Sequence, residues 1–247
     1  MSAILRVSGL YKFFDARDGA TPVLRDVSFD VEAGEFVCVM GPSGSGKSSL
    51  LHILSGLDAP SGGSVALAGK NLAQLTEAER TLTRRAQVGY VFQFFNLLPN
   101  LTVLENVGLP LAIQGARPAE READLMKLLS RLGLGGKHDS FPHQLSGGQM
   151  QRVSIARALA GGQPLLLCDE PTGNLSQKAG LEVMQLLRKV CDEDGKTVVL
   201  VTHNPRDATF ADRLMFLVDG ALDAGHELRG PGLDVERIHA ALAALHV

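Results

Sequence analysis

Apolar and polar residues alternate over the first part of the chain, and this alternation predicts strands with one buried face. It runs from Ile4 to Glu35 and is interrupted by a polar stretch at Asp15 to Thr21, where we expect a turn. Because successive side chains of a strand point to opposite faces, the segment is predicted to form an antiparallel hairpin layer. The apolar run Phe36 to Met40 follows, and Ser48 to Leu57 then has the apolar spacing of a helix.

Continuous apolar runs replace the alternation in the second half of the chain. PLLLCDE (164–170) and TVVLVTH (197–203) are apolar up to their last residues, which is typical of strands buried on both faces of a parallel sheet. A helical pattern through Leu181, Met184 and Leu187 separates the two runs. Strands separated by helices predict an α/β core.

The middle of the chain changes to a helical period. Val65 to Ala68 and Val88 to Gln93 are predicted to be further strands, and Thr76 opens a helix with Glu79 completing a capping box. From Phe94 to about Ala160 the apolar spacing is helical, with Pro118 at the start of one helix and a break at 133–136. We interpret residues of about 94–160 as an inserted helical lobe.

Composition limits the classes of protein to be considered. The chain has 247 residues, of which 45% are hydrophobic and 21% charged, and its formal net charge is -3. No global positive field is available for nucleic acid, so no nucleic-acid partner is expected. No apolar run is long enough to span a bilayer, so we expect a cytoplasmic protein that contacts the membrane through another chain. The three cysteines, 38, 168 and 191, are widely spaced and predict neither disulfides nor a metal site.

A glycine-rich loop follows the run Phe36 to Met40 directly. Its sequence is GPSGSGKS, and Ser49 comes next. In a phosphate loop of this kind, small residues let successive backbone N–H groups converge on phosphate oxygens, while Lys47 adds a charge and Ser48 can ligate Mg²⁺. The predicted nucleotide-binding residues are Gly41, Pro42, Ser43, Gly44, Ser45, Gly46, Lys47, Ser48 and Ser49.

A second glycine-rich element, LSGGQMQR, occupies residues 145–152. Ser146 is predicted to cap a helix, with Gln149 completing a capping box, so that Gly147 and Gly148 lie where helix N-terminal amides can face an anion. This element closely resembles the signature of ATP-binding cassette (ABC) ATPases. The resemblance implies that Ser146, Gly147, Gly148 and Gln149 contact ATP held by a partner subunit, and therefore that the protein works as a dimer.

The first 222 residues resemble the ATP-binding subunit of ABC transporters, with several motifs in the family's order. The resemblance implies a P-loop NTPase (RecA-like) core with an antiparallel β subdomain and an inserted α-helical subdomain in residues 1–222. Residues 223–247 lie beyond it and are interpreted as a C-terminal tail. Asp169 and Glu170 look like the end of the family's Walker B strand, so that Asp169 holds Mg²⁺ and Glu170 polarises the attacking water. A solvated acidic turn before Pro171 is the alternative for this pair.

His203 and Gln93 are the remaining catalytic candidates that the resemblance implies. His203 matches the family's switch histidine, which contacts the γ-phosphate, although a lone histidine at a strand end is usually structural. Gln93 is similar to the family's Q-loop glutamine, which contacts Mg²⁺ or water; an amide capping a loop is the alternative. Phe14 takes the position of an aromatic residue that stacks on adenine, and the neighbouring Tyr11 or Phe13 could substitute.

The segment from Gln93 to Val103 looks like the groove in which such subunits receive a membrane partner. Some of its apolar residues, Phe94, Phe95, Leu97 and Leu98, belong instead to the core, and the sequence does not say which. The tail, Asp223 to Val247, loosens into Gly and Pro before a weak amphipathic helix.

One residue departs from the family pattern. After DEPTGNL the family usually continues with aspartate, where this chain has Ser176, so a charged contact across the dimer is missing and altered cooperativity is expected. The motifs look most like the bacterial lipoprotein-release, macrolide-export and cell-division group. We therefore expect an ATP-hydrolysing subunit that pairs with itself or a related subunit, binds ATP and Mg²⁺ and powers a separate membrane protein. The alternatives are a nucleotide-dependent regulatory module with weak hydrolysis, or a cassette that drives a cell-wall-regulating membrane partner.

Overall fold

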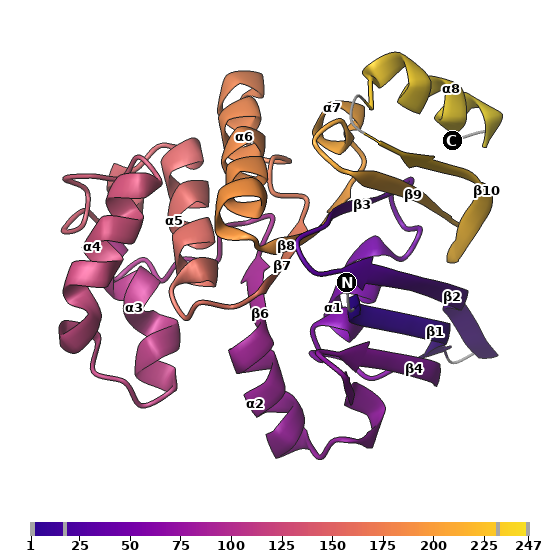
Figure 1. Ribbon diagram of the computed structural model, residues 1–247, viewed down its shortest axis with the longest axis horizontal. Helices are drawn as coiled ribbons and strands as arrows, with labels where there is room; N and C mark the ends of the chain where they lie inside the picture. Colours follow the sequence, from indigo (N-terminus) through magenta and orange to yellow (C-terminus); the bar gives the residue numbers. More distant parts are fainter. Residues whose placement is uncertain (1–2, 17–18, 231–232, 246–247) are drawn as a thin grey trace.

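The computed structural model describes residues 3–16, 19–230 and 233–245, which form two sheets with helices around them (Figure 1). The strands are β1 (Ala3–Ala16), β2 (Gly19–Glu32), β3 (Phe36–Met40), β4 (Gly62–Leu67), β5 (Lys70–Asn71), β6 (Val88–Val91), β7 (Leu165–Asp169), β8 (Thr197–Thr202), β9 (Arg213–Val218) and β10 (Ala221–Arg229). The α-helices are α1 (Lys47–Leu54), α2 (Glu77–Gln87), α3 (Val103–Ile113), α4 (Glu122–Arg131), α5 (Gly147–Leu159), α6 (Gln177–Asp194), α7 (Pro205–Ala208) and α8 (Val235–Ala244). Short 3-10 turns lie at Leu72–Gln74, Pro118–Arg121 and Pro142–Gln144.

The larger sheet has the order β10-β9-β3-β8-β7-β6, and its strands from β9 to β6 are parallel. β3 and β8 are buried at every residue, as expected for strands covered on both faces. In a parallel sheet the carboxyl ends of all strands meet at one edge, which is where ligands bind in open α/β folds. The loops after β3, β6, β7 and β8 therefore meet at this edge.

The hairpin layer is confirmed, and its strands are longer than the sequence predicts. β1 and β2 pair antiparallel as far as Ala16 and Gly19, inside the stretch for which we expected a turn. With β4 and β5 these strands form a separate sheet, and a hydrophobic cluster between the two sheets surrounds α1.

A second hydrophobic cluster joins the larger sheet to the helices α3, α4, α5 and α6. Of these, α3, α4 and α5 form the helical lobe on one side of the molecule (Figure 1). The predicted capping boxes at Thr76 and Ser146 are both present. Several predicted boundaries were wrong. The helix predicted from Ser48 to Leu57 is Lys47–Leu54, and the strand predicted from Val65 to Ala68 is Gly62–Leu67. β6 ends at Val91 rather than Gln93, and the helix predicted from Pro118 becomes α-helical only at Glu122, after a 3-10 turn.

The tail differs from the expected loose segment. β10 pairs antiparallel with β9 as far as Arg229, so the predicted boundary at residue 222 falls inside a strand. α8 then packs against α7, with Leu233, Ile238 and Ala241 buried in the core. Cys38, Cys168 and Cys191 are buried free thiols. Within the described part of the chain, every helix is too short or too polar to cross a membrane.

Candidate nucleotide site

The phosphate loop connects the end of β3 to the beginning of α1. Gly44 and Gly46 have positive φ values of 83° and 102°, and Gly46 is the N-cap of α1. A side chain is strained in this region of backbone space, which is why the loop needs glycine at these positions. The amides at the start of α1 are thereby directed at the space above the loop, where a phosphate is favoured.

Lys47 lies almost entirely buried inside the loop. Its Nζ donates hydrogen bonds to the carbonyl oxygens of Gly41 and Pro42, both at 2.8 Å. Burial lowers the pKa of this ammonium, while the nearby carboxylates of Glu170 and Asp169 oppose the shift. These acids keep a positive charge favourable at the loop, beside the position that a phosphate would occupy.

Ser48 and Asp169 meet across the site. The Ser48 hydroxyl donates to Asp169 Oδ1 at 3.1 Å, which joins the first turn of α1 to the end of β7. Burial raises the pKa of the Asp169 carboxyl, and the Ser48 hydrogen bond opposes the shift. A hydroxyl and a carboxylate placed together supply the oxygen ligands that Mg²⁺ prefers, with water and phosphate completing its shell.

Glu170 and His203 form the second polar pair of the site. His203 Nδ1 lies 2.8 Å from Glu170 Oε2, and the imidazole is 61% exposed while Glu170 is only 18% exposed. Glu170 has a positive φ of 42°, and its N–H donates to the carbonyl of Val201 in the neighbouring strand. Such a backbone conformation in a non-glycine residue costs free energy, and residues of this kind cluster at active sites.

Gln93 lies in the loop after β6, half-buried and facing the same cleft. Its carbonyl accepts a hydrogen bond of 2.9 Å from the side chain of Asn174, which follows Glu170 in the next loop. Arg157 of α5 donates to the carbonyl oxygens of Phe95 and Asn96. The loop that begins at Gln93 is therefore held both by the nucleotide site and by the helix of the signature element.

A cleft of about 840 Å³ brings these residues together. It is lined by Val23, Pro42, Ser43, Gly44, Gly46, Lys47, Ser48, Ser49, Gln93, Glu170 and His203. Of the other predicted phosphate-loop residues, Gly41 and Ser45 are buried beneath it. Val23 was not predicted, because only the pairing of β2 beside the loop brings this residue to the cleft. The side chain of Phe14 lies outside the described residues, whereas Tyr11 and Phe13 stack on each other, partly exposed.

The signature element lies elsewhere on the chain. The Ser146 hydroxyl accepts from the N–H of Gln149, and the Gln149 side chain accepts from the N–H of Ser146, so both serve to begin α5. Gly147 and Gly148 face Leu175 and Ala179, at the start of α6. Among the described residues that line the cleft, none comes from 146–149.

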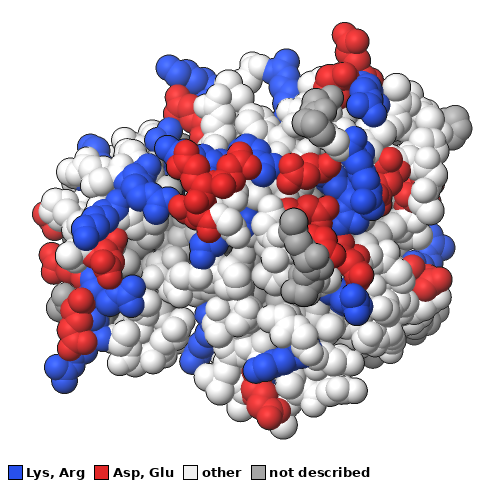
Figure 2. Space-filling model, in the orientation of Figure 1, with Lys and Arg blue, Asp and Glu red and all other residues white. Residues whose placement is uncertain are grey.

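Surface charge gives no indication of a polyanion site on the face drawn in Figure 2. Basic and acidic side chains are interspersed there, which agrees with exposed ion pairs such as Arg188 with Asp192 and Arg131 with Asp194.

The parallel sheet, the phosphate loop at its carboxyl edge, and the paired Asp169 and Ser48 define a P-loop nucleotide-binding protein with two added subdomains. Residues 24–173 match the family model described as ABC transporter. The chain belongs to this family and is an ABC ATPase, the ATP-binding subunit of an ABC transporter.

Three relatives illustrate the similarity. The lipoprotein-releasing system ATP-binding protein LolD 2 of Caulobacter vibrioides is 48% identical over 220 residues, which cover 89% of this chain and 96% of the relative. The macrolide export ATP-binding/permease protein MacB of Photorhabdus laumondii is 44% identical over 96% of this chain and 36% of its own length. A solved dimer of the cassette MJ0796, in a post-hydrolysis state bound to ADP and Pi, is 42% identical with a TM-score of 0.83, covering 91% of this chain and 98% of that one.

Proposed function

We propose that two copies of this chain enclose two ATP molecules, each between the phosphate loop of one copy and the signature element of the other. The observation that carries the proposal is the separation of the two elements. The cleft contains the phosphate loop, Gln93, Glu170 and His203, while Ser146 to Gln149 lie by the start of α6. Within one chain, the signature element thus does not line the cleft that holds the phosphate loop. The dimer of MJ0796 bound to ADP and Pi supports this arrangement.

In the proposed reaction, Ser48 and Asp169 hold Mg²⁺ and Gln93 contributes to its shell or to the nearby water. These residues fit the ion because their oxygens already meet at 3.1 Å. Glu170 accepts a proton from the attacking water, and His203, held against Glu170 by the 2.8 Å contact, orients that carboxylate beside the γ-phosphate. Phe14 stacks on adenine in this proposal.

Phosphate release by the wild-type chain and by Glu170→Gln tests the catalytic assignment. The amide keeps the size of the side chain but accepts a proton poorly, so we expect ATP to bind and phosphate release to fall by roughly 100-fold or more. Equal rates for the two proteins would exclude Glu170 as the catalytic base and favour the alternative of a regulatory module with weak hydrolysis.

We further propose that a membrane protein docks beside the loop 93–103, so that the chain lies on the cytoplasmic face of the membrane. Phe94 is 71% and Leu98 42% exposed, whereas Leu97 packs on the core and Val103 is buried. A neighbouring groove of about 390 Å³ runs between β6 and α3 and is bordered by exposed Leu57 and Ile113. Exposed apolar residues that border a groove are typical of interaction sites.

The docking proposal is tested by copurification from membranes with Glu170→Gln, which we expect to hold the ATP-bound dimer. A membrane protein should be recovered with Glu170→Gln and lost when Leu57→Glu is added, because a charged side chain then replaces an exposed apolar one at the border of the groove. Recovery that is unaffected by Leu57→Glu would place the partner elsewhere. The identity of the recovered protein separates an exporter from a complex that regulates cell-wall enzymes.

We assign residues 1–222 to the ATP-binding domain, with its helical subdomain at about 94–160, and 223–247 to a tail. β10 crosses this boundary and completes the larger sheet, so the tail is proposed to fold together with the domain rather than as a separate unit.

A further inference from the structure

Asp207 is a buried carboxylate that neither the cleft nor the proposed reaction uses. It lies in α7, four residues after His203, and only 4% of its surface is exposed. Burial raises its pKa, and hydrogen bonds from its neighbours oppose the shift. A carboxylate in such a position is costly unless every oxygen is bonded, so its partners reveal what it holds together.

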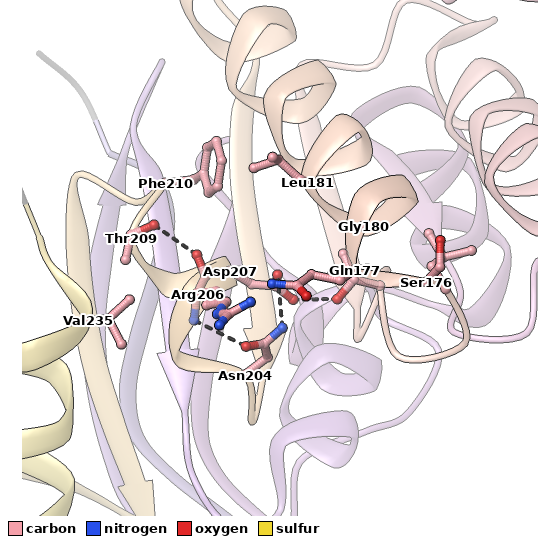
Figure 3. Close-up of a pocket in the computed structure, with 12 residues that line it drawn as sticks. Ser176, Gln177, Gly180, Leu181, Asn204, Arg206, Asp207, Thr209, Phe210 and Val235 are labelled. Atoms are coloured by element: carbon pink, nitrogen blue, oxygen red, sulfur yellow. Dashed lines mark hydrogen bonds between the residues drawn. The ribbon is translucent and has the colours of Figure 1, made fainter.

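The partners of Asp207 come from two loops at the edge of the sheet. Thr172, two residues after Glu170, donates its hydroxyl to Asp207 Oδ2. Thr202 and Asn204 flank His203. The Thr202 hydroxyl donates to Asp207 Oδ2 at 3.4 Å, and the Asn204 side-chain amide donates to Asp207 Oδ1 at 3.2 Å. Figure 3 shows Asp207 and Asn204 facing each other on α7 and its preceding loop, with the start of α6 alongside. A single carboxylate therefore joins the Glu170 loop to the His203 loop.

Backbone pairing stops before the two functional side chains. The β7–β8 ladder ends at Asp169 with Val201, and the last backbone bond is from the N–H of Glu170 to Val201. Past this point the strands diverge into separate loops. The backbone carbonyl of Thr172 also accepts a hydrogen bond from the N–H of Leu175, in the turn that leads to Ser176 at the start of α6. The position of Thr172 thus affects both Glu170 and the loop that carries Ser176.

We propose that Asp207 is a positioning residue for ATP hydrolysis, whose carboxylate fixes the separation of Glu170 and His203 by joining their loops. This inference rests on the roles proposed above for those two residues. α8 supports the arrangement from the other side, because it packs on α7 with Val235 beside the same pocket. The tail is thereby connected to the nucleotide site through α7.

The test compares steady-state phosphate release by the full-length wild type, Asp207→Ala and Asp207→Asn at varied ATP. Asp207 does not line the cleft, so the KM for ATP should change by less than about 2-fold. The kcat for Asp207→Ala should fall roughly 10- to 100-fold, because Glu170 and His203 lose their alignment. Asp207→Asn keeps the size and can bond both loops, so it should restore kcat to within roughly 3-fold of the wild type. A kcat for Asp207→Ala within about 2-fold of the wild type would overturn the inference.

Thr172→Val provides a second route if Asp207→Ala does not fold. This variant removes the hydroxyl that the Glu170 loop offers to Asp207 and keeps the shape of the side chain. It should lower kcat without changing the KM for ATP. If Asp207 acts through Thr172, the double variant is no slower than the slower single variant, whereas additive losses contradict the proposal.

Asp212→Ala is the matched control. Asp212 is also a carboxylate that holds a turn, since it accepts from the N–H of Phe36 and from Arg188, but it lies at the opposite end of the strands. Asp212→Ala should lower the melting temperature and leave kcat unchanged. An equal loss of kcat in Asp212→Ala and Asp207→Ala would show a general structural effect and would contradict a positioning role for Asp207. Glu170→Gln measured in parallel separates the two hypotheses: an active Glu170→Gln defeats the proposed function, and an inactive Glu170→Gln beside a fully active Asp207→Ala defeats only the role of Asp207.

Discussion

Gly46→Ala is the sharpest perturbation of the phosphate loop. Gly46 has a φ of 102° as the N-cap of α1, and a Cβ built on it would lie 2.7 Å from the carbonyl oxygen of Val23 and 2.9 Å from a methyl group of Leu24. The first contact is with the backbone of β2, which cannot rotate away. Alanine at this position must therefore displace either the loop or the edge of the hairpin layer.

Two costs contribute to the expected effect. Placing alanine at a positive φ costs roughly 1–3 kcal/mol. Crowding a packed contact costs roughly another 1–3 kcal/mol. Gly44→Ala separates them, because Gly44 has a φ of 83° but a Cβ there meets nothing within 4 Å. The two variants thus share the backbone cost, and only Gly46→Ala adds the clash.

Binding of ATP by titration calorimetry measures the difference. Each 1.4 kcal/mol corresponds to a tenfold change in Kd, so Gly46→Ala should bind ATP at least about 5-fold more weakly than Gly44→Ala, which itself binds more weakly than the wild type. Gly46→Ala should also melt at a lower temperature than Gly44→Ala, since its clash is present without nucleotide. Equal affinities for the two variants would refute the reasoning, because the contact with Val23 would then have no energetic consequence.

Other predictions concern charge and the dimer. Burial raises the pKa of Asp169, so the folded chain disfavours the charged form of this carboxyl. At pH 7, Asp169→Asn should therefore raise the melting temperature of the nucleotide-free protein. The same variant should lower Mg²⁺-dependent phosphate release by roughly 100-fold. This stability difference should shrink as the pH falls through the raised pKa, because the wild-type carboxyl then becomes neutral; a lower melting temperature for Asp169→Asn at pH 7 would contradict the explanation. Ser176→Asp should leave the melting temperature nearly unchanged, since both residues cap α6, but should change the ATPase rate and the Hill coefficient; equal values for wild type and variant would refute altered cooperativity. Leu57→Glu alone should leave the Kd for ATP within about 2-fold of the wild type, which calorimetry would check, because Leu57 is half-exposed and away from the cleft.

Much of the nucleotide site could be predicted because its determinants are local. The glycines of the phosphate loop, the charge of Lys47 and the capping box of Ser146 each act within a few residues, so their sequence spacing fixes their geometry. The buried strands before Asp169 and His203 were recognisable from continuous apolar runs. Their side chains lie at one edge because the strands are parallel, which the pattern of strands and helices implies.

Other features depend on contacts between distant segments, and the spacing of apolar residues along the sequence does not predict these contacts. Phe94 and Leu98 are exposed while Leu97 is not, although all are apolar neighbours in one segment. β10 forms because β9 offers it an edge, despite the Gly and Pro around it. Val23 reaches the cleft only because β2 passes beside Gly46.

The sequence by itself determined the chemistry of this protein: a loop that can hold phosphates, acids and a histidine at strand ends, and a signature element at a helix N-terminus. Only the tertiary structure decided how these parts are connected. It separated the signature from the cleft of its own chain, and it placed Asp207 between the loops of Glu170 and His203. The physical reason is that conformational preferences act over a few residues, whereas burial of a shared carboxylate depends on where whole strands and helices come to rest.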